Sequence, residues 1–362
     1  MAYTTIDDPT QYFDTTLWTG SGGARTISGL NHKPDLIWTK TRSVGYNHMW
    51  SDSSRGFNAN SEIGSNSDAA EGGLSAETYG YKSGHTSDGW TMVDGTDTVD
   101  SQEDGNTNQP SVTYVGWTWA ANGGTTTTND ASSTGVGTID SVYQANTTAG
   151  FSIVTYTGTG SAGTIAHGLG VAPTLIIGKD RSDTSQWFVQ HPAKGATHYG
   201  ELDDTTAFAD DANYFNDSTP TSTVFGIGSD GATGGTTNYV AYCFAPIQGY
   251  SKFGKYTGNG NADGPFIYLG FKPAWVMFKN TTTGHDWRIL DNTRNTFNSN
   301  NTDLRPNTSE VESSSSDMDF LSNGIKIRDT DGDLNEDGSS HVYFAFAESP
   351  FVSSKGVPTT AR

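Results

Sequence analysis

An acidic loop near the C-terminus carries the residues with the most specific potential for chemistry. In RDTDGDLNEDG, Arg328 to Gly338, oxygen-bearing side chains stand at alternate positions. This spacing lets one curved loop direct several oxygens at a hard cation such as calcium. Leu334 and Ser340 depart from an EF-hand loop, which has a turn glycine and a bidentate glutamate there. We expect either a calcium site or a solvated acidic hairpin tip. The candidate ligands are Asp329, Asp331, Asp333, Asn335 and Asp337.

A carboxylate and an arginine three residues apart form a second candidate, represented by Asp291 and Arg294. A guanidinium presents a planar fork of donors to anions, so the pair could clamp a ligand. The alternative is a fixed ion pair that pins a turn. We favour the ion pair because the spacing recurs along the chain, and recurrence marks scaffold more often than site. The aligned pairs are Asp52–Arg55, His191–Lys194 and Asp291–Arg294.

Two tryptophans, Trp187 and Trp287, precede these pairs by four residues, where the first copy has His48. Exposed indoles beside polar side chains stack on sugar faces in many carbohydrate-binding proteins, whereas buried indoles complete a core. The sequence leaves both roles open. Trp187, Trp287, Asp291 and Arg294 are therefore the candidate ligand-binding residues.

The sequence pattern of the elements that position these residues occurs three times in the chain. When the three prolines are aligned, a leucine stands four residues before each proline and a lysine six residues after it, without gaps. Such self-similarity is the signature of a repeat architecture. The aligned residues are Leu30, Pro34 and Lys40, then Leu169, Pro173 and Lys179, and then Leu269, Pro273 and Lys279.

Each repeat contains short apolar runs with period-two alternation, separated by glycine-rich turns, and little helix. We expect an all-β protein of three tandem antiparallel β-sandwich repeats of jelly-roll-like type. The order SDGW and then Y-V-x-W also resembles concanavalin-like and SPRY-type sandwiches, at the level of the fold alone. A strand is expected within SDGWTMVDG. The expected organisation is unit 1 at residues 1–122 with a long insertion at about 58–108, a linker at 123–146, unit 2 at 147–248, unit 3 at 249–352 and a polar tail at 353–362.

Composition narrows the classes of function. The net charge is −20, which would repel a phosphate backbone and argues against nucleic-acid binding. Aromatic residues make up 12% of the chain and recur at fixed positions, which argues against disorder. A single cysteine allows no intrachain disulfide. No apolar run approaches the length of a membrane span, and we expect no membrane insertion.

Catalytic signatures are lacking. The sequence contains no H-E-x-x-H pair, no G-x-S-x-G elbow and no phosphate-cradling loop. The start, MAYTTIDDPTQYF, has neither the basic nor the apolar region of a signal peptide. We therefore expect a non-enzymatic protein that would reach the outside of the cell through lysis or through assembly into a particle.

The chain resembles a family of repeat-containing virion proteins of marine tailed bacteriophages, which are structural or tail-fibre proteins. The resemblance lies in TIDDPTQYFDTTLWTGSGGARTISGL, ANTTAGFSIVTYTGTGSAGTIAHGLGVAPTLIIGKDRS, NYVAYCFAPIQGYSKFGKYTGNG, GPFIYLGFKPAWVMFKN and YFAFAESPF. It covers nearly the whole chain and supplies no catalytic residues. The sandwich sequence begins by about residue 12 without a slender shaft before it, which predicts a compact appendage.

The resemblance implies a virion appendage that is assembled in the host cytoplasm and exposed on the particle. Its expected partners are other virion proteins of the tail or capsid and a host-surface receptor, with glycans as the expected ligand. A homo-oligomer is expected, with a trimer favoured. The alternatives are a purely structural decoration or adaptor and, less favoured, a glycan depolymerase.

Overall fold

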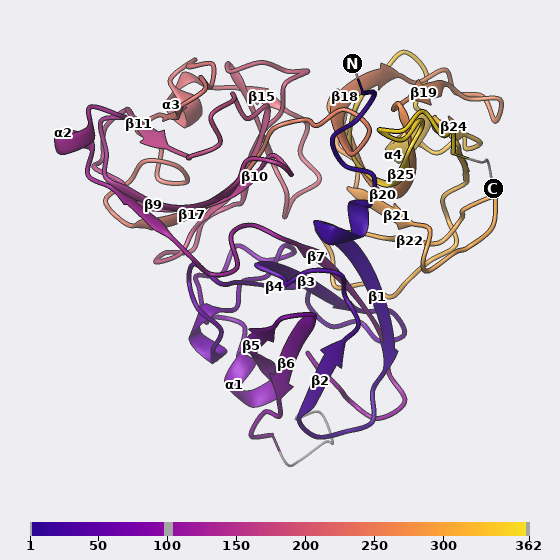
Figure 1. The fold of residues 1–362 in the computed structure, drawn as a ribbon, viewed down its shortest axis with the longest axis horizontal. Coiled ribbons are helices and arrows are strands. Elements are labelled where there is room, and N and C mark those ends of the chain that lie inside the picture. Colours follow the sequence, from indigo (N-terminus) through magenta and orange to yellow (C-terminus); the bar gives the residue numbers. More distant parts are fainter. Residues whose placement is uncertain (1, 98–103, 360–362) are drawn as a thin grey trace.

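The computed structural model describes residues 2–97 and 104–359. Figure 1 shows three β-rich lobes around a common centre, with unit 1 at the bottom, unit 2 at the upper left and unit 3 at the upper right. Antiparallel sheets dominate, and each helix has only three or four residues. The predicted fold class, an all-β protein of antiparallel sandwiches, is confirmed. No helix in the described ranges is long and apolar enough to cross a membrane.

Unit 1 is a sandwich of two sheets. Its elements are η1 (Pro9–Gln11), β1 (Phe13–Thr19), β2 (Arg25–Ser28), β3 (Leu36–Thr41), β4 (Met49–Asp52), η2 (Ala59–Ser61), α1 (Ala76–Tyr79), β5 (Tyr81–Thr86), β6 (Gly89–Val93) and β7 (Thr113–Trp119). The inner sheet has the order β1-β7-β3-β4 and the outer sheet the order β2-β6-β5.

The segment predicted as an insertion, 58–108, is part of the repeated fold. The strand expected in SDGWTMVDG is β6, which pairs with β5 and β2. Strands β5 and β6 thus supply two of the three strands of the outer sheet, a layer that the other two units also possess. Residues 98–103 of the segment lie outside the described residues. The prediction of an insertion was wrong, because a two-layered unit needs this segment to cover its inner sheet.

Unit 2 has the largest sheet. Its elements are β8 (Thr127–Asn129), α2 (Ala131–Thr134), β9 (Ser141–Asn146), β10 (Phe151–Thr157), β11 (Gly163–Ala166), β12 (Leu175–Asp180), β13 (Phe188–Gln190), β14 (His198–Glu201), β15 (Ala209–Asp210), α3 (Ala212–Phe215), β16 (Val224–Ile227) and β17 (Asn238–Phe244). The inner sheet has the order β15-β14-β13-β12-β17-β10-β9-β8, and β11 pairs with β16 outside it.

The linker predicted at residues 123–146 is wrong. Strand β9 pairs with β10 along its whole length, and β8 pairs with β9. Its Thr- and Gly-rich composition is that of a linker, but backbone pairing to an existing sheet edge needs no apolar side chains. The segment therefore extends the sheet of unit 2.

Unit 3 repeats the two-layered plan. Its elements are β18 (Ser251–Thr257), β19 (Phe266–Tyr268), β20 (Phe271–Asn280), β21 (Arg288–Asp291), β22 (Asp303–Leu304), β23 (Met318–Leu321), β24 (Gly324–Ile327), α4 (Gly332–Asn335) and β25 (Ser340–Pro350). The inner sheet has the order β18-β25-β20-β21-β22 and the outer sheet the order β19-β24-β23.

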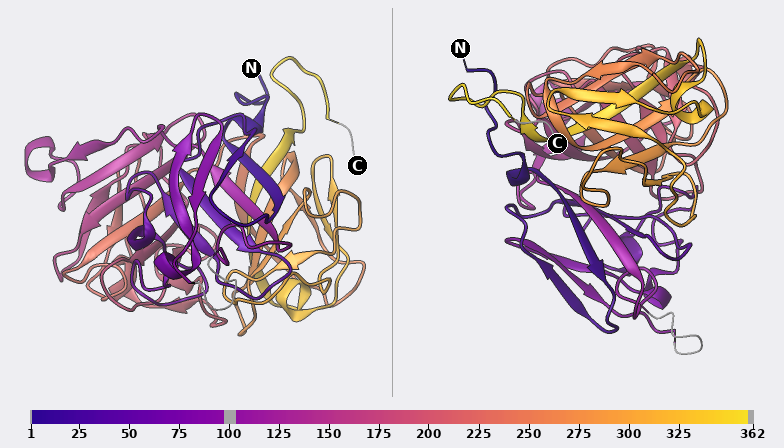
Figure 2. Two further views of the ribbon diagram at one scale, coloured as in Figure 1. Left: turned by 90° about the horizontal axis from the view of Figure 1, so that it is seen from below. Right: turned by 90° about the vertical axis from the view of Figure 1, so that its right-hand side faces the viewer.

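The described part of the N-terminal leader lies against the described C-terminal segment. In both views of Figure 2 the N-terminal segment runs beside the C-terminal segment before it enters unit 1. The Tyr3 hydroxyl donates to the carbonyl of Gly270 at 2.7 Å, and the Thr4 hydroxyl donates to the carbonyl of Gln248 at 2.8 Å. The amide of Ser354 donates to Asp7 at 2.6 Å. The leader is thereby tied to unit 3, to the tail that follows it and to Gln248 at the end of unit 2.

Alternate residues of the inner strands face two different cores. In β12, Leu175 and Ile177 pack at the centre of the molecule, whereas Ile176 packs beneath the outer layer of unit 2. Because both faces of this strand are covered, every residue of β12 is buried. The same division in the other units creates one apolar core that all three units share.

At the centre of this shared core lies a triad of aligned aromatic side chains, one from each unit. The ring centroids of Trp119 and Phe346 are 5.6 Å apart, those of Phe244 and Phe346 are 5.9 Å apart, and those of Trp119 and Phe244 are 6.5 Å apart. The remaining central cavity is about 20 Å³ and apolar. A void of that size and character remains dry, so the units pack as one body.

The repeated lysines join the units into a ring. The ammonium nitrogen of Lys40 donates to the carbonyl of Ser309 in unit 3 at 3.2 Å. Lys179 donates to the carbonyl of Asp68 in unit 1 at 3.0 Å, and Lys279 donates to the carbonyl of Thr205 in unit 2 at 3.0 Å. Each unit thus reaches its neighbour in the same rotational sense. We name these three residues, Lys40, Lys179 and Lys279, the lysine ring.

The lysine ring predicts that stability rises with pH above neutrality. Burial lowers the pKa of Lys40 to about 7 and the pKa values of Lys179 and Lys279 to about 8. An unfolded lysine keeps its proton to about pH 10, so in this window the unfolded chain binds more protons. The free energy of unfolding, measured by urea titration, should increase from about pH 7 to about pH 9, by roughly 1 kcal/mol per pH unit for each lysine.

The Lys179→Met variant provides the control for this pH dependence. It removes one titrating group while keeping an unbranched side chain of similar length, so its stability should rise less steeply over the same window. An identical slope in the variant and the parent would contradict the assignment of the pH dependence to the lysine ring.

Candidate functional site

The two candidate tryptophans lie in the interfaces between units, not on the surface. Trp187 and Trp287 are both 0% exposed. The indole nitrogen of Trp187 donates to the carbonyl of Gly64 in unit 1 at 2.7 Å, and that of Trp287 donates to the carbonyl of Glu201 in unit 2 at 2.8 Å. A buried indole offers no face to a sugar. The prediction of sugar contact at these two residues is therefore corrected to a structural role.

Residue His48 completes this second ring of contacts. Its Nε2 atom lies 2.9 Å from the carbonyl of Arg305 in unit 3, at the place where the other units have tryptophan. Its Nδ1 atom accepts from the indole of Trp38 at 2.9 Å. Full burial lowers the pKa of His48, so the ring is neutral. All three aligned side chains bind a backbone carbonyl of the neighbouring unit.

The aligned carboxylates form a third ring. Tyr242 of unit 2 donates its hydroxyl to Asp52 of unit 1 at 2.8 Å. Trp117 of unit 1 donates its indole N–H to Asp291 of unit 3 at 3.1 Å. In the third copy both aligned residues differ. His191 of unit 2 replaces the carboxylate, and Phe344 of unit 3 replaces the hydrogen-bond donor. The list of pairs is Tyr242–Asp52, Trp117–Asp291 and Phe344–His191, the last with ring centroids 5.0 Å apart.

The arginines hold these carboxylates from the other side. Arg294 pairs with Asp291 at 2.5 Å, and neither side chain is exposed. Glu312 then bridges Arg294, at 3.1 Å, and Arg42 of unit 1, at 2.8 Å. Because neither side chain reaches solvent, the pair does not serve as an accessible ligand clamp. The ligand-binding prediction for both residues is corrected to an ion pair fixed between units.

The corresponding network in unit 1 has the same design. Arg55 pairs with Asp52 at 2.5 Å, and Glu71 bridges Arg55, at 2.8 Å, and Arg181 of unit 2, at 2.7 Å. The position of Arg42 and Arg181 is occupied in unit 3 by Thr281, which donates to a carbonyl of its own unit. Two of the three interfaces are therefore bridged by a glutamate between arginines from adjacent units.

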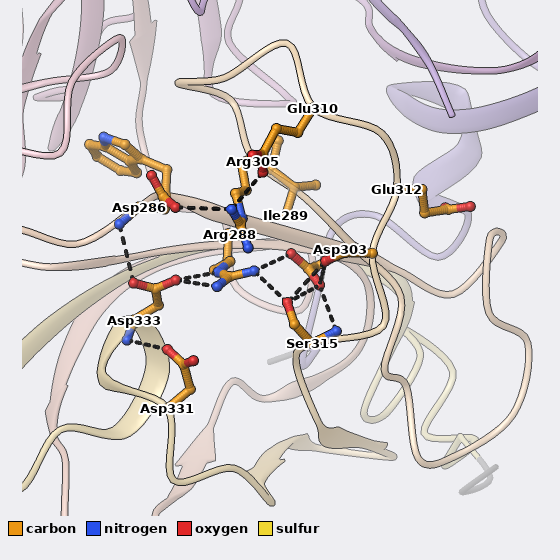
Figure 3. Close-up of polar contacts among 12 residues, drawn as sticks. Asp286, Arg288, Ile289, Asp303, Arg305, Glu310, Glu312, Ser315, Asp331 and Asp333 are labelled. Carbon is orange, nitrogen blue, oxygen red and sulfur yellow. Dashed lines mark hydrogen bonds and ion pairs between the residues drawn. The ribbon is translucent and has the colours of Figure 1, made fainter. Parts of the chain in front are cut away.

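The acidic loop binds an arginine of its own unit (Figure 3). Arg288 lies between two carboxylates, with Asp303 at 2.5 Å and Asp333 at 2.5 Å from its guanidinium nitrogens. Asp333 also contacts the Nδ1 atom of His285 at 2.9 Å. Asp331 caps helix α4, because its side chain accepts from the amide of Asp333 at 2.8 Å. These two carboxylates are committed to hydrogen bonds within the protein.

The other candidate calcium ligands are engaged in the same way or separated. Asn335 donates to the carbonyl of Asp329 at 2.7 Å, and its oxygen accepts from the amide of Asn259. Asp329 accepts from the amide of Asp331 at 2.9 Å, and Asp337 is exposed. Within the described part of the chain, no three His, Cys, Asp or Glu side chains converge as a metal site. In this structure the alternate oxygens serve a capped turn, and calcium binding by the loop stays a prediction.

An exposed aromatic face lies on the outer sheet of unit 3. Phe266 and Tyr268 flank the buried Ile267 on β19 and are 49% and 48% exposed. The strand register places Phe266 opposite Lys326, and Lys326 opposite Asp319. Opposed residues of antiparallel strands share one face of the sheet. We name this surface the aromatic face; its residues are Phe266, Tyr268, Lys326 and Asp319.

A groove of about 280 Å³ adjoins the aromatic face. Tyr268 and Lys252 form one part of its wall, with the Lys252 nitrogen 5.2 Å from the Tyr268 ring centroid. Tyr3 of the N-terminal leader lies 3.5 Å from the Tyr268 hydroxyl. Burial, followed by the Tyr268 contact, raises the pKa of Tyr3 to about 12, so its hydroxyl stays protonated at neutral pH. Exposed Gln248 adds an amide to the rim.

This face is specific to unit 3 and was not recognised in the sequence. All three units have an isoleucine directed inward from the first outer strand, namely Ile27, Ile165 and Ile267. The residues on either side are Thr26 and Ser28 in unit 1, Thr164 and Ala166 in unit 2, and Phe266 and Tyr268 in unit 3. The available signal was the alternation aromatic–Ile–aromatic after Pro265, because aromatics at strand positions opposite to a buried isoleucine must face outward.

The sequence was compared with models of known protein families. Residues 8–350 match the family described as Domain of unknown function (DUF7483). The chain belongs to this family. No curated protein matches the sequence. The DUF7483 match runs through all three units, and the shared central core gives a physical reason for treating them as one domain.

For this DUF7483 chain, Arg294→Ala is expected to destabilise the fold by about 3–5 kcal/mol, because it leaves the carboxylate of Asp291 buried without its cation. Lys194→Ala, at the aligned position of unit 2, is the control: this half-buried lysine has no carboxylate at position 191, so its loss should cost less than about 1 kcal/mol. Denaturant titration measures both. Equal costs, or loss of ligand binding by a fully stable Arg294→Ala protein, would contradict the structural role.

Removing the cap of α4 tests the acidic loop. Asp331→Ala should cost about 1 kcal/mol, the usual value for a lost N-cap. The melting temperature of both the parent and the variant should be the same with and without a calcium chelator. A chelator that lowers the melting temperature of the parent, but not that of Asp331→Ala, would instead establish a stabilising calcium site.

Proposed function

We propose that this protein is a non-enzymatic appendage of a bacteriophage virion that binds a host-surface glycan through the aromatic face of unit 3. The observation that supports this proposal is the exposed pair Phe266 and Tyr268 beside a lined groove. Exposed aromatic residues that gather on one face of a soluble protein mark interaction surfaces.

The chemistry of the face suits a sugar. Aromatic rings offer apolar surface to the C–H face of a pyranose, and their polar neighbours can bind its hydroxyls. Lys326 and Asp319 lie on the same face, paired with Asp263 and Arg328 respectively at 2.7 Å, and Lys252 and Gln248 lie at the groove. Both signs of charge are present at short range, which fits a neutral hydroxylated ligand better than a uniformly charged one.

The remaining parts of the proposal come from the resemblance of the sequence to phage virion proteins. They are exposure on the particle surface, assembly with other virion proteins of the tail or capsid, and formation of a homo-oligomer with a trimer favoured. The chain itself already arranges three sandwiches around one core. Light scattering of the purified protein measures whether chains associate further.

The aromatic face is tested by binding of the full chain to an array of purified bacterial surface polysaccharides. The double variant Phe266→Ala, Tyr268→Ala should bind at least about tenfold more weakly than the parent, corresponding to a loss of about 1.4 kcal/mol. The melting temperature should change little, because both side chains are half exposed.

The matched control is Phe297→Ala, which removes an exposed aromatic of unit 3 that belongs to neither β19 nor the groove. It should bind like the parent. If the parent binds no polysaccharide and no host cells, the glycan proposal fails and a purely structural decoration remains. New reducing ends after incubation with polysaccharide would contradict the non-enzymatic assignment and favour a depolymerase.

A further inference from the structure

A pocket in unit 2 lies apart from the aromatic face, and it borders the interface rings only through His191. Its volume is about 170 Å³, and it lies beside β13 and the loop that follows it. Pro173, Pro192 and Pro220 make much of its wall, and Pro192 is exposed at the rim. The pocket is too small for a drug-sized ligand. It has room for a small molecule or for one substituent of a larger one.

Two polar side chains of this pocket, those of Gln190 and Thr174, lack hydrogen-bond partners. Gln190 is 3% exposed, and neither its Oε1 nor its Nε2 atom makes a hydrogen bond. The Oγ1 atom of Thr174, which also lines the pocket, is buried without a partner. A buried amide with both polar atoms unpaired is rare, because desolvation then goes uncompensated. Such a group requires an explanation beyond folding.

The repeat shows that the fold itself does not need these groups. At the position of Gln190, unit 1 has Ser51, which donates to Glu62 at 2.7 Å, and unit 3 has the buried Leu290. At the position of Thr174, unit 1 has Asp35, which accepts from the amide of Ala121 at 2.7 Å, and unit 3 has Ala274. Units 1 and 3 thus have paired or apolar residues at the two positions. Only unit 2 has unpaired polar groups there.

The pocket is electrically neutral. Its lining contains no Asp, Glu, Lys or Arg side chain. Its one titratable residue, His191, is turned to other partners, since its Nδ1 accepts from the amide of Ala193 at 3.2 Å and its Nε2 lies 3.3 Å from the carbonyl of Tyr343. Burial lowers the pKa of His191 to about 3, so the ring is uncharged at neutral pH. A charged ligand would gain nothing here to offset its desolvation.

From this geometry we infer that the unit 2 pocket binds the acetamido group of an N-acetylated amino sugar. The carboxamide of Gln190 can donate to the acetamido carbonyl and accept from the acetamido N–H, which satisfies both of its unpaired atoms. The methyl group packs against the prolines, and Thr174 can pair with a further oxygen. An acetamido group ends in a methyl, so it suits a small pocket better than a peptide amide, which continues in both directions.

This site is separate from the aromatic face and does not require it. A glycan that carries N-acetyl groups could engage both, but the pocket should also bind an isolated monosaccharide. Failure of the polysaccharide proposal and failure of the pocket proposal are therefore distinguishable. A Tyr268→Ala protein should retain monosaccharide binding at the pocket, whereas a pocket variant should lose it.

The repeat supplies well-matched variants for the test. Gln190→Leu and Thr174→Ala place the residues of unit 3 into unit 2, so both proteins should fold. Binding of N-acetylglucosamine, N-acetylgalactosamine, glucose and glucosamine to the full chain is measured by NMR titration. The parent should bind at least one N-acetylated sugar at least about tenfold more tightly than glucose or glucosamine. Gln190→Leu should lose at least about tenfold in that affinity, and its melting temperature should not fall.

Four results would overturn the inference. The first is the absence of saturable binding of either N-acetylated sugar to the parent. The second is unchanged binding by Gln190→Leu, and the third is equal binding of glucose. The fourth is binding of acetamide as tight as that of the N-acetylated sugars, because the pocket would then recognise the amide alone and gain nothing from the sugar ring.

Discussion

The contact among Trp119, Phe244 and Phe346 at the centre of the molecule is the constraint on which the rest of the structure depends. One aligned aromatic from each unit meets the other two, so each inner sheet is covered on both faces. Covering a second face removes many polar groups between the units from water. Most of them find partners within the protein, several in the adjacent unit, although the indole nitrogens of Trp50, Trp119 and Trp275 are buried without one.

The interface chemistry follows from this exclusion of water. The lysine ring, the Trp187 and Trp287 indoles and the Trp117 indole that binds Asp291 all donate to a neighbouring unit in one rotational sense. The contacts close a ring because the sequence repeats. A unit that donates at one edge must accept at the other. Removing one partner leaves a buried polar group unpaired, which costs more than the lost bond itself.

The sequence was sufficient for the strands and the repeat but not for the assembly of the units. Spacing of Leu169, Pro173 and Lys179 predicted the sandwich entry correctly, because alternation within a strand is a local property. Whether Trp187 faces water or another unit depends on contacts with residues that are far away in the sequence. Local sequence patterns do not reveal such contacts. The acidic spacing around Asp331 was equally ambiguous, because a helix cap and a cation loop both use alternate oxygens. The prediction of a linker at residues 123–146 failed because strands pair through backbone hydrogen bonds, which a polar, Thr-rich segment can also form.

Differences among the aligned positions separate function from scaffold. The positions of Asp52 and Asp291 keep an arginine partner and a donor from the next unit, whereas His191 stands with Phe344 in the remaining interface. A neutral histidine needs no counter-charge, so the interface between units 2 and 3 is held without the glutamate bridge that the other two have. The pocket with Gln190 lies beside this same histidine. The unpaired amide of Gln190 therefore lies, within unit 2, beside the one aligned position that carries no charge.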